Sequence, residues 1–165
     1  MHDDHNGGTT RNDRVWTLLT AAVIAVVVVG LGALYLRANT GPRAHSGAAP
    51  LPAMFDGAPA TLDDAKAKAG EGGLVFAFAT ADWCAPCQHF KRTTLVDPAV
   101  EAWVRAHATP VYVDVDQNPQ DTTTLGVRGI PHTALLRADG TVVRTFVGVV
   151  PAEELLRSLR DAVGE

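Results

Sequence analysis

The amino-acid sequence predicts an α/β domain, in which helices flank a mixed β-sheet, behind one N-terminal transmembrane helix. The first observation is an uncharged run of 22 residues at positions 15–36. The second is that the remaining chain alternates between short apolar runs, typical of buried strands, and apolar residues spaced at the helical period. The third is the length, because 165 residues hold one ordinary domain and a short extension.

Composition and charge exclude several classes of protein. The chain is 47% hydrophobic, so disorder throughout is excluded. Its formal net charge of −4 provides no basic surface for nucleic acid, and we expect no nucleic-acid partner. It has only 2 cysteines, which excludes a small secreted scaffold dense in disulfides.

The uncharged run at 15–36 has the length of one membrane crossing. A helix of this length spans roughly 33 Å, close to the thickness of a bilayer core. Trp16 and Tyr35 lie near its two ends, where aromatic rings favour the membrane interface. The alternative is a cleaved signal peptide, but its apolar region would be only about 7–15 residues long. We therefore expect an uncleaved single-pass anchor in a lipid bilayer.

The orientation of this anchor does not follow from the flanking charges. Arg11 and Arg14 precede the run, and Arg37 and Arg43 follow it, so the count of positive residues is equal on both sides. A short N-terminal tail is easily retained in the cytosol. We expect the N-terminus to be cytoplasmic and the C-terminal domain to be extracytoplasmic, in the periplasm or an equivalent space.

The rest of the chain divides into three parts. Residues 1–14 are polar and have no apolar period, which predicts a disordered tail. Residues 37–52 are rich in Ala, Gly and Pro and are typical of a flexible tether. Residues 53–165 then form the α/β domain, at a length within the usual range for one domain.

The first half of this domain predicts a helix, a strand and a second helix. Thr61 is a candidate N-cap for a helix that ends at Gly70. Leu74–Ala79 is a continuous apolar run, as expected of a strand that is covered on both faces. A helix is then expected to begin at the cysteines and to end near Thr94.

The second half predicts a helix, three strands and a last helix. A helix restarts at Asp97-Pro98, and a β-branched strand follows at Thr109–Val115, before a polar DQNPQD stretch. Thr133–Arg137 and Val142–Val147 flank an Ala-Asp-Gly turn and predict an antiparallel hairpin. The last helix follows Pro151 and has three apolar residues on one face: Leu155, Leu159 and Val163.

The motif Asp82-Trp83-Cys84-Ala85-Pro86-Cys87 combines two cysteines with the first turn of a helix. Unpaired N–H groups and the helix dipole favour a thiolate there, and the thiolate is the form that attacks disulfides. We assign Cys84 as this nucleophile because it is nearest the helix start, and Cys87 as the thiol that resolves the mixed disulfide. Pro86 restricts the loop, and Trp83 is expected to cover one side of the site.

Three alternatives remain for the two cysteines. A zinc site would need two further ligands, such as His89 and His132, and we expect no metal. A structural disulfide would close only a very small loop and stabilise little. Two inert buried cysteines would leave the flanking Trp83 and Pro86 unexplained.

The chain resembles the thioredoxin superfamily over about residues 55–163. The resemblance rests on ADWCAPC after a strand, and on Gly129-Ile130-Pro131 ahead of a hairpin and a final helix. Within this fold, the run ADWCAPCQHFKRTTLVDPAV resembles the C-terminal domain of the transmembrane thiol:disulfide interchange reductases of the DsbD type. The resemblance implies a cis peptide at Ile130-Pro131 that faces Cys84 and holds a substrate strand. From the residues alone, Pro131 is a turn or strand-start proline, which is ordinarily trans.

Two positions depart from the family pattern. Members commonly carry a buried acid six residues before the first cysteine, where this chain has Phe78, and the DsbD type has a further acid where this chain has Lys91. We therefore hypothesise that Cys87 loses its proton through water, or to Asp82 or His132. If it lies near Cys84 and is protonated, His132 would also favour the thiolate, although such a residue is more often a surface histidine.

The sequence thus predicts a membrane-anchored thiol:disulfide oxidoreductase that reduces disulfides of other proteins through Cys84 and Cys87. Trp83, Ile130 and Pro131 are its expected substrate contacts. The chain has one predicted crossing, so a separate membrane partner must exchange electrons with it, and no cofactor is expected. The alternatives are an oxidase or isomerase, or a binding module that senses redox state or carries a metal ion.

Overall fold

The computed structural model describes residues 18–19, 21–32 and 48–165, which belong to two units, 1–44 and 45–165. In the first unit, residues 18–19 and 21–32 are helical, with exposed side chains. Within the described part of the chain, no helix is both long and apolar enough to cross a membrane. The predicted tail, the ends of the predicted anchor and most of the predicted tether lie outside the described residues, at 1–17, 20 and 33–47.

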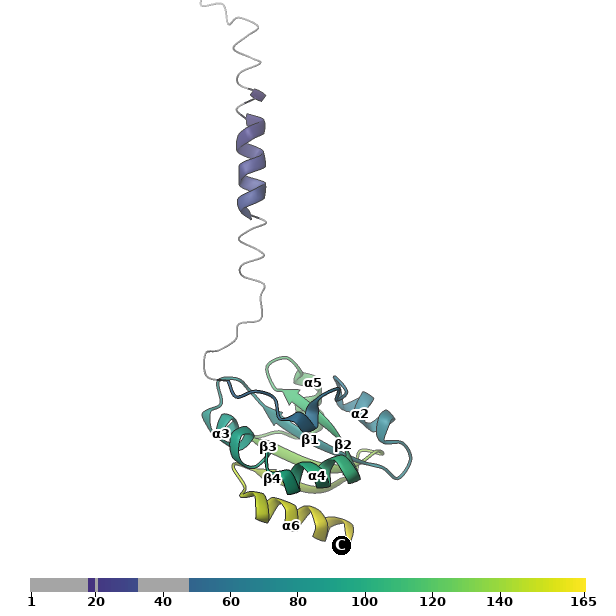
Figure 1. The fold of residues 1–165 in the computed structure, drawn as a ribbon. Helices are drawn as coiled ribbons and strands as arrows, with labels where there is room; N and C mark the ends of the chain where they lie inside the picture. The colour runs from purple at the N-terminus through teal and green to yellow at the C-terminus, as the bar shows by residue number, and fades with distance from the viewer. Residues whose placement is uncertain (1–17, 20, 33–47) are drawn as a thin grey trace, which may run out of the picture. The chain divides into compact units, whose positions relative to one another are not determined.

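The second unit is built on a four-stranded sheet with the order β2-β1-β3-β4. The strands are β1 (Leu74–Thr80), β2 (Ala108–Asp114), β3 (His132–Arg137) and β4 (Val142–Val147). β1 pairs with β2 in parallel and with β3 in antiparallel fashion, and β3 pairs with β4 in antiparallel fashion. The sheet is therefore mixed, as predicted, and the predicted hairpin is confirmed (Figure 1).

β1 is a central strand, and its residues 75–80 are all buried. Phe76 and Phe78 point to one face of the sheet, whereas Val75, Ala77 and Ala79 belong to a separate apolar cluster on the other face. This double coverage explains why the strand is a continuous apolar run and does not alternate between polar and apolar residues.

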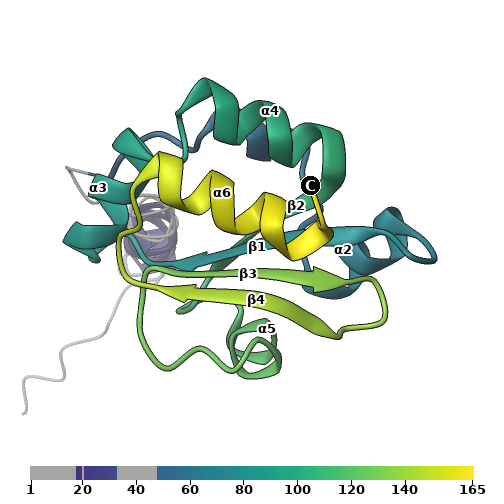
Figure 2. The same ribbon diagram turned by 90° about the horizontal axis from the view of Figure 1, so that it is seen from below.

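One face of the sheet, here called the cysteine face, is covered by three helices and a short 3-10 turn. The helices are α3 (Ala85–Thr93), α4 (Pro98–His107) and α6 (Ala152–Val163), and the turn is η1 (Ala53–Phe55). Figure 2 shows α4 and α6 side by side over this face. Its apolar cluster holds both cysteines and an aromatic group with ring centroids 5.7–6.2 Å apart: Phe55, Phe78, Phe90 and Tyr112.

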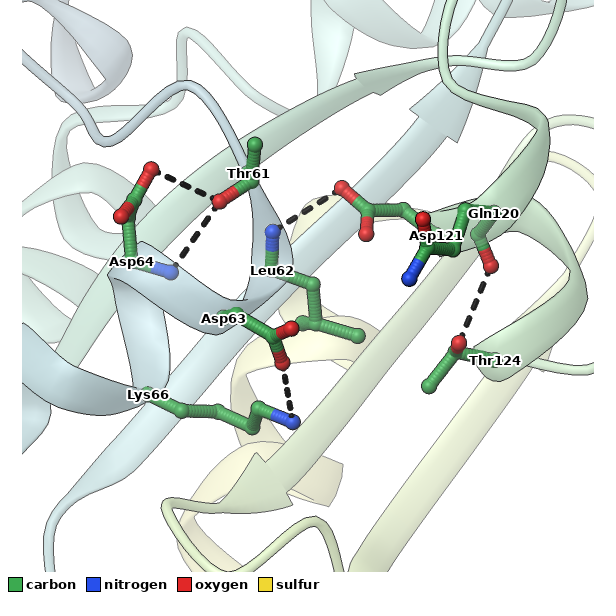
Figure 3. Close-up of polar contacts among 8 residues, drawn as sticks. All are labelled: Thr61, Leu62, Asp63, Asp64, Lys66, Gln120, Asp121 and Thr124. Carbon is green, nitrogen blue, oxygen red and sulfur yellow. Dashed lines mark hydrogen bonds and ion pairs between the residues drawn. The ribbon is translucent and has the colours of Figure 1, made fainter.

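The opposite face is covered by α2 (Leu62–Ala69) and by Leu125, the residue that follows α5 (Pro119–Thr124). Thr61 caps α2 as predicted, because its hydroxyl accepts the Asp64 N–H at 3.1 Å. Figure 3 shows how α5 reaches this cap, where the Asp121 carboxylate accepts the Leu62 N–H at 2.9 Å. The apolar side chains that this face of the sheet contributes are all aliphatic, in contrast to the aromatic cysteine face.

The structure differs from the predicted elements in a few places. The polar DQNPQD stretch contains the start of α5, a helix that the sequence analysis left out. Val163 is 37% exposed and does not share the burial of Leu155 and Leu159, because it lies at the end of α6. Residues 48–52, which we assigned to the tether, contact the domain, since Ala49 is buried and its N–H donates to the Gln88 side chain at 2.7 Å.

Candidate functional site

The two cysteines lie where β1 ends and α3 begins. Cys84 is the N-cap of α3, and its Sγ accepts the Cys87 N–H at 3.2 Å. Cys84 and Cys87 form a disulfide with an S–S distance of 2.05 Å and Cα atoms 5.2 Å apart. The Cys84 sulfur therefore occupies the position at a helix N-terminus where backbone N–H groups and the helix dipole stabilise negative charge.

Burial distinguishes the two cysteines. Cys84 is 4% exposed and Cys87 is 0% exposed, so the first cysteine is the one that retains contact with solvent. Pro86 lies in the first turn of α3, where its missing N–H leaves no helical hydrogen bond unmade. This arrangement supports the assignment of Cys84 as the attacking sulfur and Cys87 as the resolving one.

Trp83 is 61% exposed beside the disulfide and is held by a residue that the sequence analysis missed. Its indole Nε1–H donates to Oδ2 of Asp116 at 2.7 Å. Asp116 lies just after β2, 33 residues further along the chain, within the stretch that we interpreted only as a strand stop. The contact orients the large apolar surface that the site presents to solvent.

Gln88 is a second residue that sequence analysis missed, and it fastens the loop that leads into the cysteines. Its buried side chain donates from Nε2 to the carbonyls of Ala81 at 3.0 Å and Asp82 at 3.1 Å, and its Oε1 accepts the Ala49 N–H. One amide thus joins the start of α3, the end of β1 and the first residues of the domain. The sequence signal that could have identified Gln88 is a polar residue one helical turn after Cys84.

The Ile130-Pro131 peptide bond is cis, which confirms the expectation drawn from the family resemblance. Pro131 is buried, and its carbonyl accepts the Gly148 N–H at 2.8 Å. His132 pairs with Ala79, so the start of β3 lies beside the end of β1, which leads to Cys84. Ile130 packs against the apolar cluster that contains both cysteines. The register therefore brings the proline loop and the cysteine loop to one end of the sheet.

His132 does not behave as the sequence analysis expected. It is 4% exposed, so it is not a surface histidine, and neither ring nitrogen has a hydrogen-bond partner. Burial lowers its pKa, which disfavours the protonated form proposed to assist the thiolate. Because side chains alternate along a strand, His132 shares its face with Ala134 and Leu136, on the side opposite the cysteine cluster.

Two side chains occupy the positions where the family pattern has acids. Phe78 is fully buried among the aromatic rings of the cysteine face. Lys91 is 3% exposed, and its Nζ donates to the Tyr112 hydroxyl at 2.9 Å. Burial lowers the pKa of Lys91, while the charges of Asp82 and Asp114 act in the opposite direction. Asp82 itself is half-buried at the entrance to the cysteine loop.

The zinc alternative does not match this arrangement. Both cysteine sulfurs are used in the disulfide, His89 is exposed on α3, and His132 points to the other face of the sheet. Among the residues that the structure describes, no group of three or more His, Cys, Asp or Glu side chains is placed to hold a metal ion. In this structure the two sulfurs are bonded to each other and not arranged as separate ligands.

Comparison with known families agrees with this site. Residues 60–163 match the family model of the thioredoxin-like domain. The chain belongs to the thioredoxin-like family. The thioredoxin of Listeria monocytogenes is 38% identical over 86 residues, which cover 50% of this chain and 77% of that protein. The thioredoxin of Alicyclobacillus acidocaldarius is 35% identical over 86 residues, covering 50% of this chain and 75% of that protein.

Solved structures show the same thioredoxin-like fold. A DsbH oxidoreductase superposes with a TM-score of 0.58 at 17% identity, covering 76% of this chain and 93% of the other. The thioredoxin of Trypanosoma brucei brucei superposes with a TM-score of 0.53 at 21% identity, covering 76% and 99%. With its Cys84–Cys87 disulfide at the start of α3, this thioredoxin-like chain is a thiol:disulfide oxidoreductase.

Proposed function

We propose that the protein is a membrane-anchored reductase of protein disulfides whose thioredoxin-like domain works outside the cytoplasm. The observation that carries the proposal is the Cys84–Cys87 disulfide at the N-terminus of α3, with Cys84 the less buried of the two residues. A helix N-terminus lowers the pKa of a thiol, and this favours attack on a substrate disulfide.

In the proposed cycle, the Cys84 thiolate attacks one sulfur of a substrate disulfide. A mixed disulfide forms with Cys84, and the other substrate sulfur leaves as a thiolate and takes up a proton. Cys87 then loses its proton and attacks Cys84 Sγ, which releases the second substrate sulfur as a thiolate. The substrate has gained two electrons, and the domain is left with the Cys84–Cys87 disulfide that the structure contains. A donor dithiol from a separate membrane protein reduces this disulfide again.

The proposed substrate contacts are the residues at the same end of the sheet. Trp83 presents an exposed indole that Asp116 orients, and it would cover the extended substrate strand. The backbone beside the cis Ile130-Pro131 bond would hold that strand against Cys84. Asp82 and Pro86 complete the loop and tune the reactivity of the cysteines.

Membrane attachment rests on residues 15–36. The run is uncharged, and the side chains described within it are exposed and largely apolar, including Val26, Val29 and Leu31. Exposed apolar side chains along one helix are suited to a lipid environment. The run ADWCAPCQHFKRTTLVDPAV supports a relationship to the C-terminal domain of DsbD-type reductases. This chain would then need a separate membrane protein to supply its electrons.

Turnover is tested with the full chain, purified in mild detergent, on the interchain disulfides of insulin. With excess dithiothreitol as the electron donor, the protein should accelerate insulin reduction, and Cys84→Ser should return the rate to that of dithiothreitol alone. Equal rates with and without the unmodified protein would overturn the proposed reductase activity.

Sidedness and direction are tested by trapping thiols in intact cells with a membrane-impermeant maleimide. Labelling of Cys84 and Cys87 without prior reduction would place the domain outside the cytoplasm and show a dithiol that a partner keeps reduced. Labelling only after reduction would retain this topology but contradict the reductase direction, because it indicates an oxidase or an idle disulfide. Labelling only after lysis would place the domain in the cytosol and contradict the proposed localisation.

A further inference from the structure

Lys91 is buried one helical turn beyond the resolving cysteine. It is the fourth residue after Cys87 on α3, and residues four apart share one face of a helix, with Cβ atoms about 5–6 Å apart. Side chains on a helix lean toward its N-terminus, which directs Lys91 back toward the turn that contains Cys87. Both side chains are buried against the cysteine face of the sheet.

The surroundings of Lys91 suit either protonation state of its amine. Its Nζ lies 2.9 Å from the Tyr112 hydroxyl and 5.0 Å from the centroid of the Tyr112 ring, and both contacts stabilise the ammonium. Asp82 and Asp114 favour the ammonium through their charge, while burial favours the neutral amine and lowers the pKa of Lys91 overall. Burial, with the charges of Asp82 and Asp114, raises the pKa of Tyr112 to about 12, so its phenol stays neutral.

Cys87 is buried and needs a nearby group that can accept its proton. When Cys87 resolves a mixed disulfide it must lose a proton in a place with little access to water, since the residue is 0% exposed. A lone thiolate there would be costly. Of the two side-chain acceptors named from the sequence, His132 points to the opposite face, and Asp82 is half-buried in the loop before Cys84, whereas Cys87 lies inside α3.

We propose that Lys91 is the proton partner of Cys87. In the reduced protein, Nζ of Lys91 accepts the proton of the Cys87 thiol, which converts a neutral thiol and amine into a thiolate and an ammonium. The proton moves within the pair, so the net charge of the buried pocket stays constant. The thiolate then attacks Cys84 Sγ, the bond between Cys84 and the substrate sulfur breaks, and that sulfur leaves with the electron pair.

The pair also links protonation to redox state. Once the Cys84–Cys87 disulfide has formed, Lys91 has no thiolate to neutralise its charge, and burial favours release of the proton to solvent. Reduction restores the thiol and raises the affinity of Lys91 for a proton. Cys87 and Lys91 therefore titrate as a coupled pair in the dithiol form, under the influence of Tyr112, Asp82 and Asp114.

The proposal is tested by titrating a single thiol. Cys84→Ser in the full chain leaves Cys87 as the one cysteine, and its thiolate is followed by absorbance at about 240 nm as the pH rises. Adding Lys91→Met should raise the apparent pKa of Cys87 by one unit or more, which is a loss of thiolate of about tenfold at a given pH.

Arg92→Met is the matched control. Arg92 is the next residue on α3 and is exposed, so this change removes a neighbouring basic side chain without touching the pocket. It should leave the Cys87 titration unchanged. Lys91→Gln serves as a second neutral variant if Lys91→Met does not fold, as judged by circular dichroism. An unchanged Cys87 titration in the folded Lys91 variant would overturn the proposal, as would an equal shift in Arg92→Met.

This inference rests on the proposed function, but its test requires no turnover. If the Cys87 titration depends on Lys91 but the chain fails to reduce insulin, the reductase activity is disproved and the proton pair is supported. If the chain reduces insulin and Lys91→Met leaves the Cys87 titration unchanged, the reductase activity is supported and the proton pair is disproved. The two proposals can therefore fail separately.

Discussion

Lys91 and His132 are both buried ionisable side chains near the cysteine end of the sheet, but they meet different surroundings on its two faces. On the cysteine face, Lys91 contacts the Tyr112 hydroxyl and ring and is within the influence of Asp82 and Asp114. On the opposite face, both ring nitrogens of His132 lack a partner. A group that exchanges a proton needs compensation in both protonation states, and the structure provides it on the cysteine face.

Both residues bind a proton less tightly in the folded chain than in the unfolded one, because burial lowers their pKa values. Between the lowered pKa and the ordinary value, the unfolded chain binds more protons, and stability rises with pH. For His132 this interval ends at the ordinary value of 6.5, and for Lys91 at 10.5. The loss of folding stability caused by His132 therefore appears as the pH falls below 6.5.

The largest predicted loss of stability comes from a substitution in the aromatic packing of the cysteine face. Phe78→Ala removes a fully buried ring that contacts Phe55, Phe90 and Tyr112. The free energy of unfolding should fall by about 3–5 kcal/mol, as is usual for a buried phenylalanine. Urea unfolding followed by circular dichroism measures this change. A loss below about 1 kcal/mol would show that this face is not the closely packed one.

The second prediction concerns Gln88, whose buried side chain is hydrogen-bonded near the cysteines. Gln88→Leu leaves the buried Ala49 N–H and the Asp82 carbonyl without their partner, while the Ala81 carbonyl still accepts the Cys84 N–H. Stability should fall by about 1–3 kcal/mol, the usual cost of a buried unpaired polar group. Hydrogen exchange at the Ala49 amide, read by nuclear magnetic resonance, should become faster. Unchanged exchange there would contradict the role of Gln88 in fastening the loop.

The third prediction has the opposite sign and concerns the other face. His132→Leu removes two unpartnered ring nitrogens and should stabilise the fold by about 1 kcal/mol at pH 8. The gain should grow between pH 6.5 and pH 5, because the unmodified chain loses stability there as its unfolded state takes up a proton. Urea titrations at several pH values measure the gain, and the exposed His89→Gln is the matched control. A gain that does not depend on pH would disprove the account of His132.

The smallest expected effect on stability is at the exposed rim. Asp116→Ala removes the acceptor of the Trp83 indole N–H, a contact at the surface that should contribute less than about 1 kcal/mol. Its effect should appear instead in the Michaelis constant for insulin, which should rise while the unfolding free energy stays nearly constant. An unchanged Michaelis constant would contradict the orienting role of Asp116.

The elements with a periodic apolar pattern could be predicted from the sequence. β1 was recognisable because coverage on both faces leaves it continuously apolar, and the Thr61 cap because its partner Asp64 is three residues away. α5 could not be predicted, since it has 6 residues and none is buried. Its Asp121 accepts a hydrogen bond from Leu62, 59 residues away, and no local spacing reveals such a contact.

The same reason limited prediction of the site. The cysteine motif and the proline are local signals, and the cis bond at Pro131 followed from the family resemblance. Gln88, Asp116 and the partner of Lys91 were missed because their hydrogen bonds join residues 39, 33 and 21 positions apart. His132 was expected either near Cys84 or at the surface, whereas it is buried on the opposite face, because a single residue after a proline does not reveal which face it will occupy.

The central claim is that Cys84 attacks and Cys87 resolves. The most direct measurement is to trap the mixed disulfide with insulin, using reduced Cys87→Ser and Cys84→Ser variants of the full chain. Products are separated on a non-reducing gel, and the bonded cysteine is identified by mass spectrometry. The account predicts a long-lived adduct through Cys84 in Cys87→Ser and none in Cys84→Ser. An adduct through Cys87 in Cys84→Ser, with none in Cys87→Ser, would contradict it.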